Sequence, residues 1–378
     1  MTLSMNACRL STSLIGLALL AASASAQEDL TTWETETYGS PMRPPNWTLL
    51  ANQATQSEDS DVASIARGGQ TLGDKVTTVE MTPFHLTGIS EDQVGLVFGA
   101  GAGMASDANA DYIAMLWGGA TGLLADDPTC TTGGSCFTGL RLFSVKGIPT
   151  QDEFWQGQDQ DTVCSPLGVG LTEIAQSTNL GNTAWGQNQT YSVEIRLSDC
   201  ALRIAIDGTP EFEVLGDMSN IVDGELGLYS MSQRLLVTDV NYSPLPNPAS
   251  ITVAGPGTMG SDRIPSLTFD GCATNGGSFD FTILNSSDTN ISTGLLFLSP
   301  QPTNFFLGLV GGNIYLNPAA SASLTTNAPA GGTFQLGFNL TPDPALIGMD
   351  FGAQAFWLDT AATANVALTN GLLVVIGE

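Results

Sequence analysis

The stretch GELGLYSMSQRLLVTDVNY, residues Gly224–Tyr242, decides the fold class of this chain. In its first half Leu226 and Leu228 alternate with other residue types. In its second half Leu236 and Val240 are an even number of positions apart, so they would project from one face of a strand. A period of two is typical of strands that bury one face. Two such strands on either side of a short polar turn predict a β-hairpin.

The same pattern recurs through residues 27–243. Runs of aliphatic, aromatic and β-branched residues, most of them roughly six to eight residues long, are separated by Gly and Asp turns. Helical periodicity is almost absent. This organisation predicts an all-β antiparallel sandwich. The predicted strands are 77–84, 94–99, 111–117, 139–146, 190–197, 201–206 and 211–215.

The order of these fragments resembles that of a known family. Val94–Gly99, Asp111–Trp117, Gly139–Val145, Leu202–Ile206 and Gly227–Gln233 follow one another as in the lectin-like C-terminal domain of thrombospondins. The resemblance implies a calcium-loaded, L-type lectin-like, concanavalin A-like jelly roll. The calcium-binding repeats that precede this domain in thrombospondins are absent from this sequence.

Residues 1–26 have the order of a secretory signal peptide. Arg9 precedes the apolar run Leu14–Ala22, and the small residues Ala24–Ala26 follow it. We therefore expect a mature chain that begins at Gln27 and is secreted to the extracellular space or cell surface, with the periplasm as the alternative. The sequence after residue 26 contains no run of about 18 apolar residues, so we expect no membrane insertion.

The acidic excess of the chain limits its partners. Without the leader, nine basic residues stand against 37 acidic ones. Nucleic acid and anionic membranes are therefore poor partners, whereas cations are attracted, and carboxylate oxygens suit calcium. Asp61, Asp92 and Asp111 are the candidate calcium ligands, because they lie in loops or at strand entries. The alternative for each is an aspartate that caps a turn.

Five cysteines remain after the leader. Cys130 and Cys136 enclose a flexible loop that could close locally, and Cys164 with Cys200 is then the remaining pair in the first domain. Cys272 would be left free or joined to a partner chain. Disulfides of this kind are consistent with export.

A second domain follows a proline-rich linker at residues 244–249. Residues 250–378 contain one base, Arg263, and no lysine or histidine, and they alternate as short strands that predict a small accessory β-sandwich. The segment resembles a C-terminal module of large secreted planctomycete proteins. We expect it to serve attachment, spacing or packing against the first domain.

These observations predict a non-enzymatic, calcium-binding lectin-like or adhesion module that recognises glycan or extracellular matrix. Trp155, in an acidic, Gln-rich loop, is the candidate for stacking on a sugar, whereas Trp117 ends an apolar strand and is expected in the core. One alternative is a laminarinase-like glycoside hydrolase, for which Glu34 with Glu36 and Glu211 with Glu213 provide paired acids, neither pair with a third. The other is a structural cell-surface protein.

Overall fold

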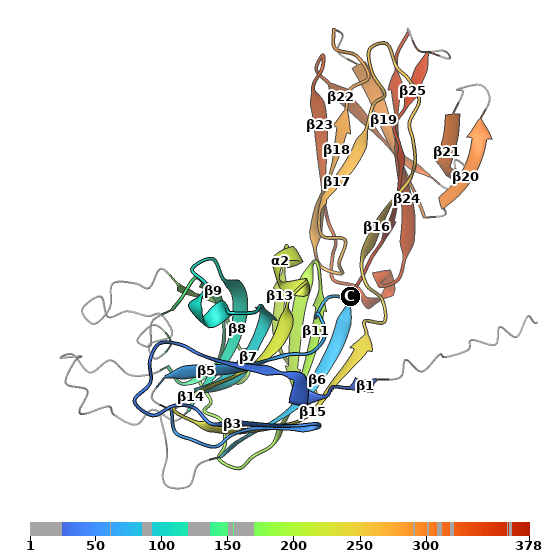
Figure 1. Cartoon of the computed structure of the whole chain (residues 1–378). Helices are drawn as coiled ribbons and strands as arrows, with labels where there is room; N and C mark the ends of the chain where they lie inside the picture. Colours follow the sequence, from blue (N-terminus) through green and yellow to red (C-terminus); the bar gives the residue numbers. More distant parts are fainter. Residues whose placement is uncertain are drawn as a thin grey trace, which may run out of the picture.

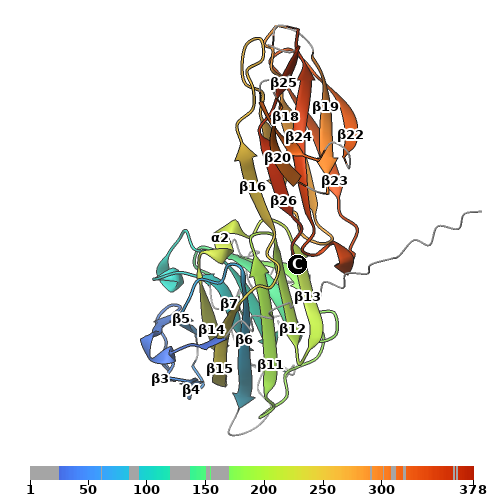
Figure 2. The ribbon, with the colours of Figure 1, turned by 90° about the vertical axis from the view of Figure 1, so that its right-hand side faces the viewer.

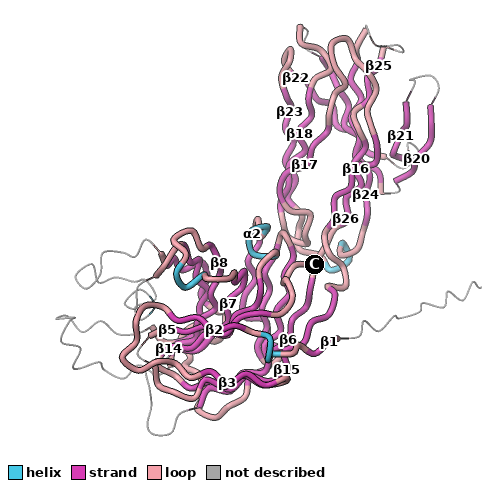
Figure 3. The backbone as a smooth tube through the Cα atoms, in the orientation of Figure 1, coloured by secondary structure: helices cyan, strands magenta, loops and turns pink. Residues whose placement is uncertain are grey.

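The computed structural model describes residues 25–60, 62–84, 93–119, 137–149, 154, 170–289, 292–300, 302–307, 312–317, 321–360, 362 and 365–378. These ranges are nearly all strand and loop, as Figure 3 shows. The helical segments within them are short: η1 (Leu30–Thr32), η2 (Met104–Ser106), α2 (Ser219–Val222) and η3 (Pro344–Leu346). In this part of the chain no helix is long and apolar enough to cross a membrane.

Two antiparallel sheets form the first sandwich. The eight-stranded sheet has the order β13 (Thr209–Leu215), β12 (Ala201–Ile206), β11 (Tyr191–Ser198), β6 (Lys75–Phe84), β15 (Arg234–Pro244), β4 (Gln53–Gln56) and β3 (Trp47–Leu50), with β1 (Ala26–Gln27) paired to β15. The seven-stranded sheet has the order β10 (Leu171–Gln176), β9 (Gly139–Lys146), β8 (Asp111–Gly118), β7 (Gln93–Ala100), β14 (Glu225–Met231), β5 (Ala63–Gly68) and β2 (Glu34–Thr37).

The first sandwich has two apolar layers rather than one. Ile113, Met115 and Trp117 of β8 lie in the core between the two sheets. Their neighbours Tyr112 and Leu116 point to the other side of the seven-stranded sheet, where a second buried cluster lies. An apolar strand that is buried on both faces needs no polar alternation, which explains the continuous run of apolar residues in β8.

The hairpin predicted for Gly224–Tyr242 is wrong. β14 pairs with β5 and β7 in the seven-stranded sheet, whereas β15 pairs with β6 and β4 in the eight-stranded sheet. Both edges of β14 are therefore occupied, so β15 cannot pair with it. The chain crosses between the sheets at Ser232, which has a φ of 57°, and at Gln233, whose Nε2 donates a 2.7 Å hydrogen bond to the carbonyl of Phe84.

The remaining sheets form the second, smaller sandwich. Its six-stranded sheet has the order β16 (Ser250–Gly255), β26 (Gly371–Val375), β24 (Asp350–Leu358), β19 (Ser292–Ser299) and β22 (Ala322–Ala328), with β25 (Val366–Leu368) paired to β24. Opposite lies a sheet of β17 (Leu267–Gly271), β18 (Ser278–Leu284) and β23 (Thr333–Asn339). The strands β20 (Pro302–Leu307) and β21 (Gly312–Leu316) form a separate two-stranded sheet, and the N–H of Tyr315 in β21 donates a 3.1 Å hydrogen bond to Gln354 of β24. Trp357 and Phe281, from the two facing sheets, are buried in the shared core.

This arrangement confirms the predicted all-β fold class, a sandwich of two antiparallel sheets followed by a second, smaller β-sandwich. Residues 139–146 and 201–206 form strands with the predicted bounds.

The second sandwich stands on one end of the first (Figure 1). The C-terminus lies at the junction of the two in both views, and β16 and β26 lie above the ends of β11 and β12 in Figure 2. Arg196 of β11 forms a 2.5 Å ion pair with the carboxylate of Glu378. Nη2 of Arg203, in β12, donates a 3.3 Å hydrogen bond to the carbonyl of Asn275. The two sandwiches are thus in direct contact through the eight-stranded sheet.

Candidate functional site

The outer face of the seven-stranded sheet is covered by chain segments that cross it. Tyr38, η2, Phe137 and Phe154 pack on side chains of β5, β7, β8, β9 and β14 to form the outer-face cluster. Any ligand of this face would have to contact the covering segments, because these side chains fill the face of the sheet itself. The outer-face cluster consists of Tyr38, Ala63, Ile65, Val97, Ala100, Met104, Ala105, Tyr112, Ala114, Leu116, Phe137, Phe143, Val145, Phe154, Leu171, Tyr229 and Met231.

Polar atoms inside the outer-face cluster hold one of these segments in place. The hydroxyls of Tyr38 and Tyr112 are 2.6 Å apart and form a buried hydrogen bond. Oη of Tyr229 donates to Oε1 of Gln93 at 3.3 Å. Nε2 of the same glutamine, which is fully buried, donates to the backbone carbonyl of Phe154 at 2.7 Å. The backbone at residue 154 is therefore fixed to the sheet by a hydrogen bond that is shielded from water.

Aromatic packing adds to this attachment. The ring of Phe154 lies 5.1 Å from that of Tyr38 in an edge-on contact and 5.4 Å from that of Tyr229. Burial is the main cause that raises the pKa of Tyr38 and of Tyr112 far above the usual value of a phenol. Both hydroxyls therefore stay neutral at physiological pH, and their role here is to satisfy each other's hydrogen bonds.

A buried arginine lies at the β2 edge of the same sheet. The side chain of Arg67, in β5, is 6% exposed and contacts three carboxylates: Glu34 at 2.6 Å, Glu36 at 2.7 Å and Glu225 at 2.8 Å. The strand register explains the convergence, because Arg67 pairs directly with Glu34 on one side and with Gly227 on the other. A guanidinium has five donors in a fork, which suits it to several carboxylates at once.

Glu36 links this arginine to a covering segment. Its Oε1 and Oε2 accept hydrogen bonds from the backbone N–H groups of Gly103 at 2.8 Å and Ala105 at 3.0 Å, at the start of η2. Burial alone would raise the pKa of Glu36, but these bonds and that from Arg67 together lower it. The carboxylate stays ionised at neutral pH, so it is unsuited to be the proton donor of a glycosidase.

The candidate calcium ligands are mostly outside the described residues. Asp61 and Asp92 belong to this group, and their role stays a prediction. Asp111 starts β8 on the surface, where its Oδ2 lies 3.7 Å from Nζ of Lys146, its cross-strand partner. Within the described ranges, no three His, Cys, Asp or Glu side chains are grouped so that they could hold a metal ion. The positive charge of Lys146 beside Asp111 therefore disfavours calcium binding at this carboxylate.

The structure describes one of the two tryptophans singled out in the sequence, Trp117. Trp117 is 2% exposed, its indole Nε1 donates to the carbonyl of Thr183 at 2.8 Å, and its ring lies 4.5 Å from that of Tyr191. The prediction that Trp117 is a core residue is confirmed. Trp155, the candidate for sugar stacking, lies outside the described residues, directly after the anchored Phe154.

The acids proposed for the hydrolase alternative do not form a catalytic pair. Glu211 is 2% exposed and accepts hydrogen bonds from the hydroxyl of Ser177 and, at 2.9 Å, from the N–H of Asn179. A β-bulge in the pairing of β12 with β13 leaves Glu211 without a cross-strand partner, and Glu213 forms an exposed ion pair with Arg203 at 2.8 Å. Glu211 thus stabilises a loop, whereas the carboxylate of Glu213 is engaged by Arg203.

Two of the five cysteines of the expected mature chain, Cys200 and Cys272, lie in the described part of the structure. Cys130, Cys136 and Cys164 lie outside the described residues, so their disulfides stay predictions. Cys200 carries a free thiol, and its neighbour is Cys272 of the second sandwich. Cys272 is 7% exposed, so it is poorly placed to join a partner chain.

Comparison with known proteins gives a fold likeness only. No family model and no curated protein matches the chain. The carbohydrate binding module CBM66 from Bacillus subtilis shares 10% identity, over 57% of this chain and 96% of that chain, with a TM-score of 0.34. The exoplasmic/lumenal domain of VIP36, in a form with Ca²⁺ and Man2 bound, shares 11% identity over 59% of this chain and 88% of that chain, with a TM-score of 0.38.

A protein of unknown function with a galectin-like fold from Bacillus subtilis is similar as well. It shares 12% identity, over 57% of this chain and 90% of that chain, with a TM-score of 0.32. At these identities and TM-scores, none of the three assigns a ligand to this chain. The resemblances to thrombospondins and to a planctomycete module stay predictions.

Proposed function

We propose that this chain is exported and acts as a non-enzymatic lectin-like or adhesion module, which recognises a glycan or an extracellular-matrix component and is stabilised by calcium. The recognition site comprises the segments that cover the outer face of the first sandwich, with Trp155 as the residue that stacks on a sugar ring.

The attachment of Phe154 to the sheet is the observation that carries this proposal. The bond from Gln93 and the ring contacts with Tyr38 and Tyr229 fix the residue directly before Trp155 on a rigid sheet. A binding residue next to a fixed backbone position loses less conformational freedom when a ligand binds, so more of the contact energy is available for affinity. The neutral tyrosines and the ionised Glu36 nearby favour binding over proton transfer.

We expect Trp155→Ala to weaken glycan binding at least about tenfold, because a tryptophan that stacks on a ligand is commonly a dominant contact. The mature protein is applied to a glycan array in calcium, and each glycan that binds is titrated with both proteins. Phe306→Ala is the matched control, since it removes a ring that is 67% exposed on the second sandwich. Equal binding by Trp155→Ala and the unchanged protein would contradict the assigned role of Trp155.

Calcium is expected to raise the midpoint of thermal unfolding by several degrees. A ligand that binds only the folded state at about 100 times its Kd stabilises that state by about 2.7 kcal/mol. The measurement is calorimetry in millimolar calcium and in chelator. Asp92→Asn should reduce the difference, whereas Asp239→Asn, an exposed aspartate of β15, should leave it unchanged. A midpoint that is the same with chelator and with calcium would exclude a stabilising calcium site.

A further inference from the structure

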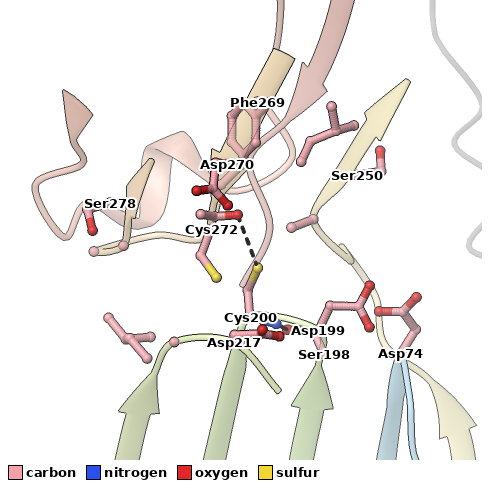
Figure 4. Close-up of a pocket in the computed structure, with 18 residues that line it drawn as sticks. Asp74, Ser198, Asp199, Cys200, Asp217, Ser250, Phe269, Asp270, Cys272 and Ser278 are labelled. Atoms are coloured by element: carbon pink, nitrogen blue, oxygen red, sulfur yellow. Dashed lines mark hydrogen bonds between the residues drawn. The ribbon is translucent and has the colours of Figure 1, made fainter. Parts of the chain in front are cut away.

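Two cysteines face each other across the junction of the two sandwiches. Cys200 lies in the turn between β11 and β12, and Cys272 directly follows β17. Both line a cleft of about 800 Å³ whose walls come from both sandwiches. Figure 4 shows that Cys200 reaches into the cleft from the first sandwich and Cys272 from the second.

The thiol of Cys200 reaches the segment that carries Cys272 (Figure 4). The two side chains are close enough to affect each other's pKa. Sγ of Cys200 also lies 4.0 Å from the carbonyl oxygen of Gly271, the residue before Cys272. A disulfide requires sulfurs about 2.05 Å apart and α-carbons usually about 4.4–6.8 Å apart. Two cysteines that enter one cleft from its opposite walls are placed to reach this geometry by a local movement.

Other contacts hold the two sandwiches in the position that brings these thiols together. The 2.5 Å ion pair of Arg196 with Glu378 and the bond from Arg203 to the carbonyl of Asn275 connect the same two strands, β11 and β12, to the second sandwich. Asn275 in turn accepts a 2.7 Å hydrogen bond from the N–H of Asp343 through its side chain. Both cysteines thus lie in a docked interface.

We propose that Cys200 and Cys272 form a disulfide that joins the two sandwiches covalently when the exported chain meets a disulfide-type oxidant such as glutathione disulfide. This pairing replaces the expected bond from Cys200 to Cys164, and it connects residues on opposite sides of the linker at 244–249.

The exchange balances with an external disulfide as the oxidant. The thiolate of Cys200, the more accessible of the two, attacks one sulfur of the oxidant, forms a mixed disulfide and displaces the first thiolate. The thiolate of Cys272 then attacks Sγ of Cys200 and displaces the second. Two electrons pass to the oxidant, and the two thiol protons end on the two released thiols.

The environment makes this reaction slow but leaves the product protected. Burial is the main cause that raises the pKa of both thiols, and the carboxylates of Asp199 and Asp217 add to the effect. Few thiolates are therefore present at neutral pH, which slows oxidation. A thiol of raised pKa is also a poor leaving group, which slows reduction of the finished bond.

Tryptic mapping of the full chain tests the proposal, because the basic residues place each of these cysteines on a separate peptide. Arg196 and Arg203 bound the peptide 197–203 with Cys200, Lys146 and Arg196 bound 147–196 with Cys164, and Arg263 precedes 264–378 with Cys272. The protein is incubated with glutathione disulfide, alkylated, denatured and digested without reduction. We expect 197–203 to be joined to 264–378, and reduction to lower the midpoint of thermal unfolding by roughly 5 to 10 °C.

Cys272→Ser is the control variant, in which Cys200 should no longer join 264–378. A peptide 197–203 joined to 147–196 in the unchanged protein would overturn the proposal in favour of the Cys164 pairing. Alkylated Cys200 and Cys272 after oxidation would overturn it as well, because they would show that the thiols do not react with each other.

Discussion

Arg67→Met is expected to lower the free energy of unfolding at pH 7 by about 3 kcal/mol, the size of effect seen when one partner of a buried ion pair is removed. The variant leaves Glu36, whose side chain is 13% exposed, without its cation. Glu34 and Glu225 are 70% and 33% exposed and can be hydrated, so most of the loss arises at Glu36. Urea unfolding of both proteins measures the difference.

The pH dependence of this loss separates charge from packing. The folded state lowers the pKa of Glu36, so this residue contributes stability above the pKa of the unfolded state, and the contribution is lost as the pH falls through the folded pKa. The difference between Arg67→Met and the unchanged protein should therefore be largest at neutral pH and shrink below about pH 4. Lys146→Met, which removes a 3.7 Å ion pair to Asp111 between side chains that are 68% and 40% exposed, should cost less than about 1 kcal/mol. Equal losses for the two variants would contradict the central role of Arg67.

The sequence predicts most strands of the first sandwich because their apolar pattern is set locally. Residues 139–146 and 201–206 alternate or run apolar in a way that only a strand can bury. The partners of β14 and β15 could not be predicted in the same way, since a period of two does not say which sheet a strand joins. That choice depends on β5 and β7, which occupy both edges of β14.

The candidate site was less accessible to prediction because its residues come from distant segments. Gln93 anchors Phe154, 61 positions away, and no local pattern marks either residue. Arg67 did leave a signal, as a single charge in the otherwise uncharged strand Ala63–Gly68, which indicates a buried cation that needs acidic partners. The proximity of Cys200 to Cys272 depends on how the two sandwiches dock, and a count of cysteines cannot provide it.

Trp117→Ala is expected to destabilise the first sandwich by about 3 to 5 kcal/mol, the range for removing a large buried aromatic side chain. The indole is 2% exposed and contacts the ring of Tyr191, so alanine would leave a cavity in the core between the sheets. The carbonyl of Thr183 would also lose its 2.8 Å hydrogen bond. Calorimetry should show the change in the unfolding of the first sandwich, while Trp357 keeps the separate core of the second intact.

Trp117→Phe distinguishes packing from the polar contact. It retains a ring against Tyr191 but removes the donor to Thr183, so it should cost about 1 to 3 kcal/mol, less than the alanine variant. Comparison with Trp155→Ala then tests whether Trp117 belongs to the core and Trp155 to the binding site. The Trp117 variants should unfold at a lower temperature. Trp155→Ala should bind glycan more weakly but unfold at the same midpoint as the unchanged protein. The opposite result would contradict this division: a Trp117→Ala protein that unfolds like the unchanged chain but no longer binds glycan. Such a protein would mean that the indole of Trp117 contacts the ligand, whereas the structure encloses it in the core.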